Sequence, residues 1–130
     1  MKSAVSSELE RSGFVLHFEP FESPFERINW NRYRPDIFGV AAERAELRIV
    51  VAECETEPNV RRISNKTQKI RKWLRFQKKL NEEHDFCFLL AIPSGKLKKV
   101  NTIAVRRFWD IWILNNKGSI LHKIPHASNP

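Results

Sequence analysis

The chain has few cysteines and glycines and no long apolar run, and each shortage excludes a class of protein. Its two cysteines, Cys54 and Cys87, lie inside apolar runs without CxxC or Cys/His spacing, so we expect free thiols rather than a zinc site or a disulfide framework. The 4 glycines form no phosphate-binding loop. No segment approaches the roughly 20 apolar residues that span a bilayer, and the first residues have no signal-peptide pattern, so we expect a cytoplasmic protein without a membrane partner.

The overall composition is that of an ordinary globular protein, with 42% hydrophobic and 29% charged residues. A length of 130 residues is enough to bury a hydrophobic core without a stabilising metal or disulfide. The 4 histidines are scattered and form no metal-ligand or nucleophile pattern. We therefore predict a single domain, 1–130, without internal repeats.

Charge is distributed unevenly along the chain, whose formal net charge is +8. Residues 1–60 contain 11 acids and 7 bases, a net charge of −4, whereas residues 61–130 contain 4 acids and 16 bases, a net charge of +12. A protein that binds a polyanion next to a separate acidic site would show this asymmetry. Excess lysine and arginine also keep a protein soluble, so charge leaves both interpretations open.

Hydrophobic periodicity and turn residues predict alternating helices and strands. An antiparallel meander followed by a helical crossover into a buried strand predicts a mixed sheet flanked by helices. In chain order, the expected elements are a helix at 3–12, a strand from residue 14 to Pro20, an irregular segment at 20–35, strands at 37–40 and 47–54 joined by the polar connection 41–46, a helix at 62–83, a strand at 86–92, a helix at 96–107, a strand at 109–115 and a frayed tail.

The helix expected at 62–83 has one apolar face, which includes Ile63, Ile70 and Trp73. Most of its basic residues point away from that face. Lys66 is the exception, because it falls between Trp73 and Ile70 on the face expected to pack on the sheet. Lys69 lies at the edge of the same apolar face. A lysine in this place either serves a site or extends its ammonium group out to solvent along a buried stem.

Three carboxylates are expected to meet at one edge of the sheet. Glu53 and Glu55 are two residues apart at the end of a strand, so they point the same way. If the preceding strand pairs antiparallel with it, Asp36 lies beside them. Mutual repulsion favours a bound cation, and hard oxygen ligands suit Mg²⁺ or Mn²⁺, which can activate water for phosphodiester hydrolysis. Alternatively, these acids are a post-proline turn residue and a solvated strand end.

The pair Pro35-Asp36, the seventeen residues from Asp36 to Glu53 and the helix that follows resemble the PD-(D/E)xK nuclease superfamily, which includes restriction endonucleases and archaeal Holliday-junction resolvases. The resemblance covers about residues 5–92, with 93–130 as a C-terminal extension. It implies a restriction-endonuclease-like α/β fold: a central mixed sheet flanked by helices, in the order α-β-β-β-α-β. It also implies metal binding by Asp36 and Glu53, joined by Glu10 from the first helix as in resolvase-like members.

One position departs from the family pattern. Glu55 stands where the family usually has a lysine, two residues after the second acid. A minority of restriction enzymes have a glutamate there, and in other variants a lysine from the following helix reaches the same place. The resemblance therefore implies a catalytic role for Glu55, for Lys66, or for both.

Basic residues predict where nucleic acid would bind, since lysine and arginine contact phosphates without reading sequence. The segment 30–34 interleaves aromatic residues with arginines, which suits contact with a nucleic-acid strand and equally the docking of a loop on the core. The candidate nucleic-acid-binding residues are Arg32, Arg34, Arg62, Lys69, Arg71, Lys72, Arg75, Lys98 and Lys99.

Taken together, these features predict a Mg²⁺- or Mn²⁺-dependent DNA endonuclease, acting on structured or branched DNA. Two alternatives stay open: a nucleic-acid-binding module without activity on the same fold, and an RNA-processing or protein-interaction subunit. A homodimer paired through an edge strand or the strand at 109–115 would supply two sites for the two strands of a duplex.

Overall fold

The protein's structure, a computed structural model, describes residues 1–17, 33–43, 46–77 and 84–127. Most of the segment expected to be irregular, 20–35, lies outside these residues. The same holds for the end of the helix expected at 62–83.

The described chain forms one mixed sheet with the strand order β1-β2-β3-β4-β5-β6. The pairs β1–β2, β2–β3 and β5–β6 are antiparallel, and β3–β4 and β4–β5 are parallel. This confirms the mixed sheet expected from the sequence. The strands are β1 (Val15–His17), β2 (Ile37–Glu43), β3 (Glu46–Cys54), β4 (Asp85–Pro93), β5 (Asp110–Leu114) and β6 (Ile120–Ile124).

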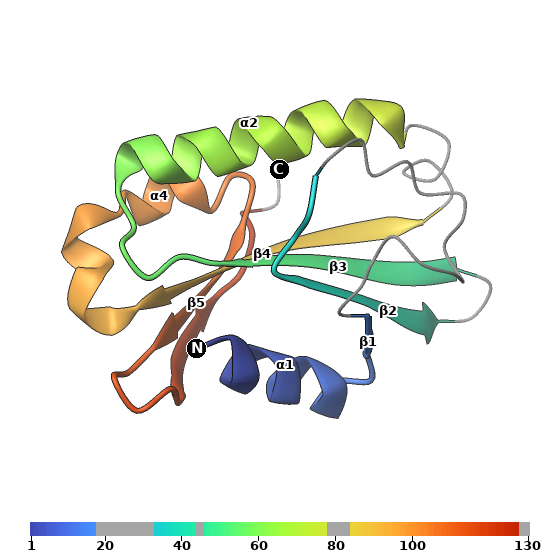
Figure 1. The fold of residues 1–130 in the computed structure, drawn as a ribbon, viewed down its shortest axis with the longest axis horizontal. Coiled ribbons are helices and arrows are strands. Elements are labelled where there is room, and N and C mark those ends of the chain that lie inside the picture. The colour runs from blue at the N-terminus through green and yellow to red at the C-terminus, as the bar shows by residue number, and fades with distance from the viewer. Residues whose placement is uncertain (18–32, 44–45, 78–83, 128–130) are drawn as a thin grey trace.

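Helices cover the sheet on both faces, with α2 (Val60–Phe76) on one side and α1 (Lys2–Arg11) on the other (Figure 1). The order α1-β1-β2-β3-α2-β4 confirms the element order expected over the first part of the chain. A 3-10 helix, η1 (Ser94–Lys99), and a short helix, α4 (Thr102–Val105), connect β4 to β5. Each face has its own apolar cluster, because residues of the sheet alternate between the two sides.

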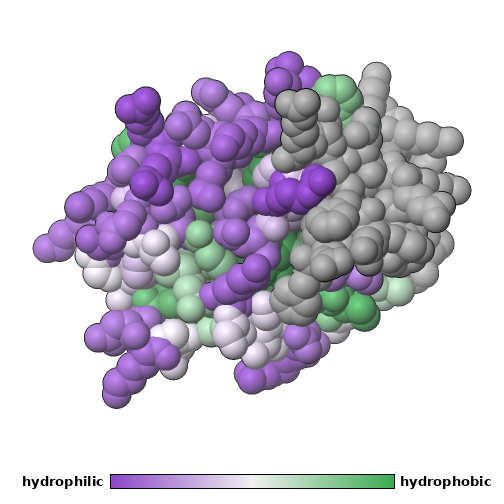
Figure 2. Space-filling view, viewed as in Figure 1, coloured by the Kyte–Doolittle hydropathy of each residue, from purple (hydrophilic) through white to green (hydrophobic). Residues whose placement is uncertain are grey.

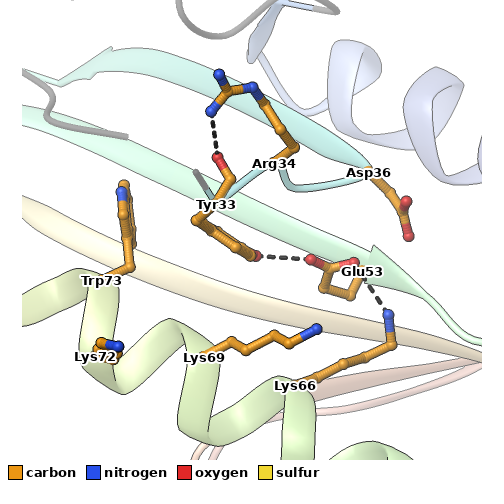
Figure 3. A pocket seen from close by; sticks show the side chains of 8 residues that line it. All are labelled: Tyr33, Arg34, Asp36, Glu53, Lys66, Lys69, Lys72 and Trp73. Carbon is orange, nitrogen blue, oxygen red and sulfur yellow. Dashed lines mark hydrogen bonds and ion pairs between the residues drawn. The ribbon is translucent and has the colours of Figure 1, made fainter. Parts of the chain in front are cut away.

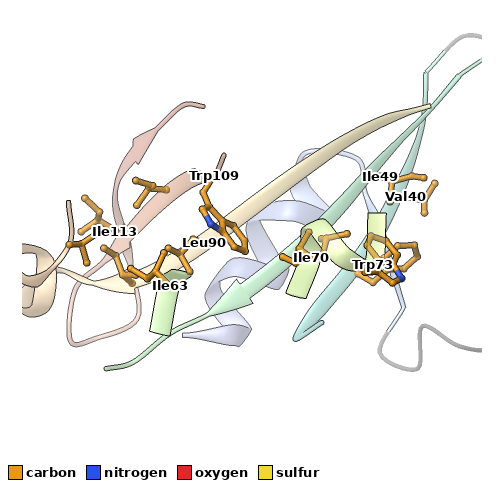
Figure 4. Packing of buried hydrophobic residues seen from close by; sticks show 13 residues of the cluster. Val40, Ile49, Ile63, Ile70, Trp73, Leu90, Trp109 and Ile113 are labelled. Atoms are coloured by element: carbon orange, nitrogen blue, oxygen red, sulfur yellow. The ribbon is translucent and has the colours of Figure 1, made fainter. Parts of the chain in front are cut away.

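The helix α2 packs on the sheet through the apolar face that the sequence predicts. Ile63, Ile70 and Trp73 are almost fully buried in the cluster shown in Figure 4. Asn59 caps the helix, since its Oδ1 accepts a hydrogen bond from the backbone N–H of Arg62 at 2.9 Å. The helix therefore starts at Val60, two residues earlier than expected.

The hairpin β2–β3 brings the predicted site residues to one end of the sheet. Its register pairs Ile37 with Ala52 and Glu43 with Glu46, so most of the polar connection expected at 41–46 is strand. Continuing the pairing satisfies backbone hydrogen bonds that a loop would leave to water. Asp36, one residue before β2, therefore lies beside the last residues of β3.

The C-terminal part differs from the sequence-based expectation in two places. The continuous helix expected at 96–107 is η1 and α4, separated around Val100, which is buried in the core. The tail expected to be frayed contains β6, which pairs with β5 after a turn at Asn115–Gly118 in which Gly118 has a positive φ. Alternation of apolar and polar side chains predicts a strand poorly at the edge of a sheet, because less of such a strand is buried.

The addition of β6 corrects one route proposed for a dimer. Because β5 lies between β4 and β6, the strand expected at 109–115 has both edges paired and cannot join a second copy. The expected homodimer would have to use another surface, such as one of the outer strands of the described sheet, β1 or β6.

Both cysteines of the described chain are free and half-buried. Burial raises the pKa of the Cys54 thiol to about 11 and that of Cys87 to about 12, so both stay protonated at neutral pH. The two free thiols confirm the prediction from the sequence. Among the described residues, no helix combines the length and the hydrophobicity that crossing a membrane requires.

Candidate active site

An open groove of about 670 Å³ runs between the segment that leads into β2 and one side of α2 (Figure 3). We call it the lysine-lined groove. It has acids on one side, lysines on the other and an aromatic pair at one end. Its lining residues are Tyr33, Arg34, Asp36, Glu53, Lys66, Lys69, Lys72 and Trp73.

Asp36 is held in place by the backbone of the neighbouring strand. Its Oδ2 accepts a hydrogen bond from the N–H of Cys54 at 2.8 Å. This bond ties the start of β2 to the end of β3 and sets the Asp36 carboxylate next to that of Glu53. The structure thus brings together the two acids that the sequence identifies as metal ligands.

Glu53 is 5% exposed and contacts a hydroxyl and an ammonium group. Its Oε1 accepts a hydrogen bond from the Tyr33 hydroxyl at 2.7 Å, and its Oε2 lies 3.3 Å from Lys66 Nζ. Burial is the main cause that raises the pKa of Glu53 to about 7, and the charge of Asp36 adds to it. The Tyr33 hydroxyl and Lys66 act in the opposite direction. Near neutral pH Glu53 is therefore only partly ionised in the metal-free protein.

The raised pKa of Glu53 predicts that the metal-free protein becomes less stable as the pH rises. Glu53 has an ordinary pKa of 4.5 when unfolded, so between pH 4.5 and 7 the folded state binds more protons, and stability falls as pH rises through this window. The full effect is roughly 3 kcal/mol. In EDTA, the free energy of unfolding of wild type should fall by this amount relative to Glu53→Gln between pH 4.5 and 8. Parallel pH curves for the two proteins would contradict the raised pKa.

Lys66 lies on the sheet-facing side of α2, as the helical pattern predicts, and its ammonium group joins the two glutamates. Its Nζ is 3.3 Å from Glu53 Oε2 and 3.8 Å from Glu55 Oε2. The ammonium therefore reaches the acids and does not extend past them into solvent.

Glu55 does not line the groove, which corrects the expectation of three carboxylates on one ion. Its Oε1 lies 3.4 Å from Arg62 Nη1 and accepts a hydrogen bond from the backbone N–H of Glu57. Within the described ranges, no group of three His, Cys, Asp or Glu residues is arranged to hold a metal. The chain turns after β3, so Glu55 faces the first turn of α2 while Glu53 faces the groove.

Glu10 does not join the site either. It lies exposed in the last turn of α1, and α1 covers the face of the sheet opposite to α2 (Figure 1). The helix buries Val5 and Leu9 against that face, which leaves Glu10 in solvent. The expected contribution of a first-helix glutamate to the metal is therefore wrong for this chain.

The predicted nucleic-acid-binding residues lie partly in the groove and partly outside it. Three of them, Arg34, Lys69 and Lys72, line the groove, and the Arg34 guanidinium donates to the Tyr33 carbonyl at 2.9 Å. Hydrophilic side chains gather over α2 and around η1 on the face shown in Figure 2. Arg32 lies outside the described residues. The others lie elsewhere: Arg62 pairs with Glu55, Arg71 lies over the Phe108 ring at 5.3 Å, and Arg75, Lys98 and Lys99 are exposed.

Tyr33 is a site residue that the sequence did not single out. Its ring packs on Trp73 with centroids 5.5 Å apart, and its hydroxyl bonds to Glu53. Burial, with the charge of Glu53, holds the pKa of Tyr33 well above its ordinary value, so the hydroxyl stays a donor. The available signal was an aromatic residue three positions before Asp36, which could equally have been a loop anchor.

The donor chemistry of Asp36 and Glu53 fits a hard divalent cation. Asp36 uses Oδ2 for a backbone hydrogen bond, and Glu53 accepts one hydrogen bond at each oxygen, from the Tyr33 hydroxyl and from the Lys66 ammonium. A divalent cation would take the place of the Lys66 ammonium at Glu53 Oε2 and offset the burial that raises the pKa of Glu53. Mg²⁺ is commonly bound by only one or two carboxylates, with water and substrate phosphate completing its octahedron. Two carboxylates in an open groove meet that requirement.

Comparison with known proteins identifies the class of fold. No family model matches the chain, and no curated protein matches it either. The six-stranded mixed sheet flanked by helices is nevertheless shared with solved structures of α+β proteins.

Two such structures resemble the chain over nearly its whole length. One is an XisH family protein from Nostoc punctiforme, with a TM-score of 0.54, 13% sequence identity and coverage of 95% of this chain and 97% of that chain. The other is an FdxN element excision controlling factor protein from Anabaena variabilis, with a TM-score of 0.52, 13% identity and coverage of 94% and 95%. At this identity the similarity establishes the fold alone.

Proposed function

We propose that the protein is a metal-dependent endonuclease that hydrolyses phosphodiester bonds in DNA. The observation that carries this proposal is the contact of Lys66 with Glu53, 3.3 Å apart, beside Asp36 in an open groove lined by further lysines. Two carboxylates and one lysine are the groups that phosphodiester hydrolysis with a divalent cation needs.

Each residue has a distinct part in this proposal. Asp36 and Glu53 would hold Mg²⁺ or Mn²⁺, which when bound activates water and neutralises charge on the phosphate. Tyr33 orients the Glu53 carboxylate through its hydrogen bond. Lys66 donates to the attacking water or to the phosphate oxygen that gains negative charge. Its role replaces that of the lysine usual at the position of Glu55.

Glu55 acts on Lys66 and not on the metal in this arrangement. It lies 3.8 Å from the Lys66 ammonium and is itself paired with Arg62. The resulting chain of alternating charges holds Lys66 between Glu53 and Glu55, which are both buried. Its ammonium group therefore stays beside the proposed metal ligands.

Two further observations support DNA as the substrate. The second half of the chain has a net charge of +12, and part of this charge lines the groove. One of the two similar structures is named as an excision controlling factor of the FdxN element. The excision in that name agrees with the DNA-directed role proposed for this chain.

The main competing function is a nucleic-acid-binding module without catalysis. It is favoured by the finding that the described residues contain no group of three metal ligands. On that hypothesis Lys66 neutralises Glu53 permanently, and the groove binds phosphates only.

Cleavage of DNA by the purified protein separates the two functions. Supercoiled plasmid and a four-way junction, incubated with Mg²⁺ or Mn²⁺, should be cut, and EDTA should stop the reaction. Single-stranded RNA of the same sequence serves as the comparison. DNA binding without cleavage under all metal conditions would sink the enzyme and leave the binding module.

A further inference from the structure

We propose that the lysine-lined groove holds one unpaired nucleic-acid strand, whose phosphates follow α2 from Lys66 to Lys69 and Lys72. The position of the reacting phosphate rests on the function proposed above. The grip on the strand does not, because it comes from lysines that take no part in holding a metal.

The groove carries an excess of positive charge. Among the described residues, four bases and two acids line it, so this lining is positive even without a metal ion. Lys66 is engaged by Glu53 and Glu55. Lys69 and Lys72 are exposed, and in the described part of the chain neither forms an ion pair. Two ammonium groups without a described acidic partner, beside an acidic pair, are suited to an anion that continues past the acids.

The lysines of the groove are regularly spaced along α2. Lys66, Lys69 and Lys72 follow one another at three-residue intervals, which is about 4.5 Å of helix rise each. One strand of B-DNA rises about 3.4 Å per phosphate, and an extended strand rises more. The flexible four-carbon stems of lysine cover this difference. In Figure 3, Lys66 and Lys69 extend toward Glu53 and Lys72 lies farther along the helix, so the three lysines follow one wall of the groove.

The groove is small compared with a DNA duplex. A space of about 670 Å³ is that of a pocket for a drug-sized ligand, which corresponds to one or two nucleotides. A duplex, whose major groove alone is about 12 Å wide, does not fit within it. The groove therefore selects a strand that has separated from its complement, as at a branch or a flap.

The end wall of the groove indicates how the strand is recognised. Trp73 is 1% exposed and packs against Tyr33, whose hydroxyl is bonded to Glu53. Trp73 belongs to the core and Tyr33 is half-buried against it, so neither ring is an exposed platform on which a base could stack. The grip is therefore on phosphate, and the groove should bind strands of different sequence about equally.

The chain supplies a matched control of equal charge. Arg61 on α2 and Lys117 in the turn after β5 are exposed like Lys69 and Lys72, but neither lines the groove. Successive residues are about 100° apart around a helix, which puts Arg61 on the side of α2 away from the sheet. Removing Arg61 and Lys117 takes the same charge from the protein without touching the groove.

The test is the salt dependence of binding to a fluorescein-labelled 12-nucleotide DNA strand in EDTA. For Lys69→Gln/Lys72→Gln, the slope of log K against log salt should fall by about 1.4, which is about 0.7 for each lost phosphate contact, with roughly 20-fold weaker binding at 0.1 M salt. Arg61→Gln/Lys117→Gln should keep the wild-type slope. Wild type should prefer the strand to the same sequence as a blunt duplex.

Equal loss of slope in both double variants, or tighter binding to the duplex, would overturn the strand proposal. Thermal unfolding of each variant checks that the exposed substitutions leave the fold intact. Absence of metal-dependent cleavage would refute the nuclease alone, since the slopes are measured without metal.

Discussion

Asp36→Asn is expected to lower the metal-dependent cleavage rate by about 10³-fold or more, because it removes one of two carboxylates that would hold the ion and because metal stabilisation of the transition state amounts to several kcal/mol. Asparagine keeps a carbonyl oxygen that can accept the hydrogen bond now made by the N–H of Cys54 to Asp36 Oδ2 at 2.8 Å. The fold and the affinity for DNA should therefore persist. The measurement is the initial cleavage rate, with DNA affinity measured in EDTA.

Glu57→Gln is the matched control for Asp36→Asn. Glu57 is an exposed acid four residues after Glu53, and it pairs with Lys96 at 3.2 Å outside the groove. The substitution Glu57→Gln changes the net charge by the same amount as Asp36→Asn. The cleavage rate of this variant should nevertheless stay within about twofold of wild type. Full activity of Asp36→Asn would exclude a metal at this position.

Lys66→Met is expected to lower the cleavage rate by about 10²- to 10³-fold, the usual loss when one donor to developing charge is removed. Methionine preserves the unbranched stem that passes along α2 but removes the ammonium 3.3 Å from Glu53. Glu53 then keeps the Tyr33 hydroxyl but no longer has the cation, so its pKa should rise further above about 7 in the metal-free protein. The rate should therefore fall most near neutral pH and recover in part at higher pH.

Lys96→Met distinguishes a specific role of Lys66 from a general loss of positive charge. Lys96 Nζ lies 3.2 Å from Glu57 Oε2, a distance similar to that between Lys66 and Glu53, but it does not line the groove. Its removal should leave both the rate and its pH dependence close to wild type. If the two variants lose activity equally, Lys66 has no special part in the chemistry.

The element order and the sheet could be predicted from the sequence because they depend on local patterns. The apolar face of α2 and the apolar strands on either side of it are visible in the order of residues. β6 was missed because its residues 120–124 are mostly exposed, so the strand shows no burial pattern. The prediction of one continuous helix at 96–107 was wrong, because the chain buries Val100 between η1 and α4.

The candidate site was predicted in part. Asp36, Glu53 and Lys66 were recognised from spacing and helical phase, and the structure brings them together. Glu10 could not be excluded beforehand, because nothing in a helical pattern tells which face of the sheet the helix will cover. Tyr33 could not be identified, because its hydrogen bond joins residues 20 positions apart in the chain.

The order of residues is sufficient to establish the charge asymmetry, the mixed sheet and the presence of acids next to a basic helix, since these follow from composition and from contacts close in sequence. Whether the three acids share one ion depended on how the chain turns after β3. That turn brings Glu55 to Arg62 and Lys66 and leaves Glu53 beside Asp36, because a buried carboxylate must find a partner and the first two turns of α2 offer both bases. The place of each acid is thus a property of the packed helix and sheet, which no local pattern contains.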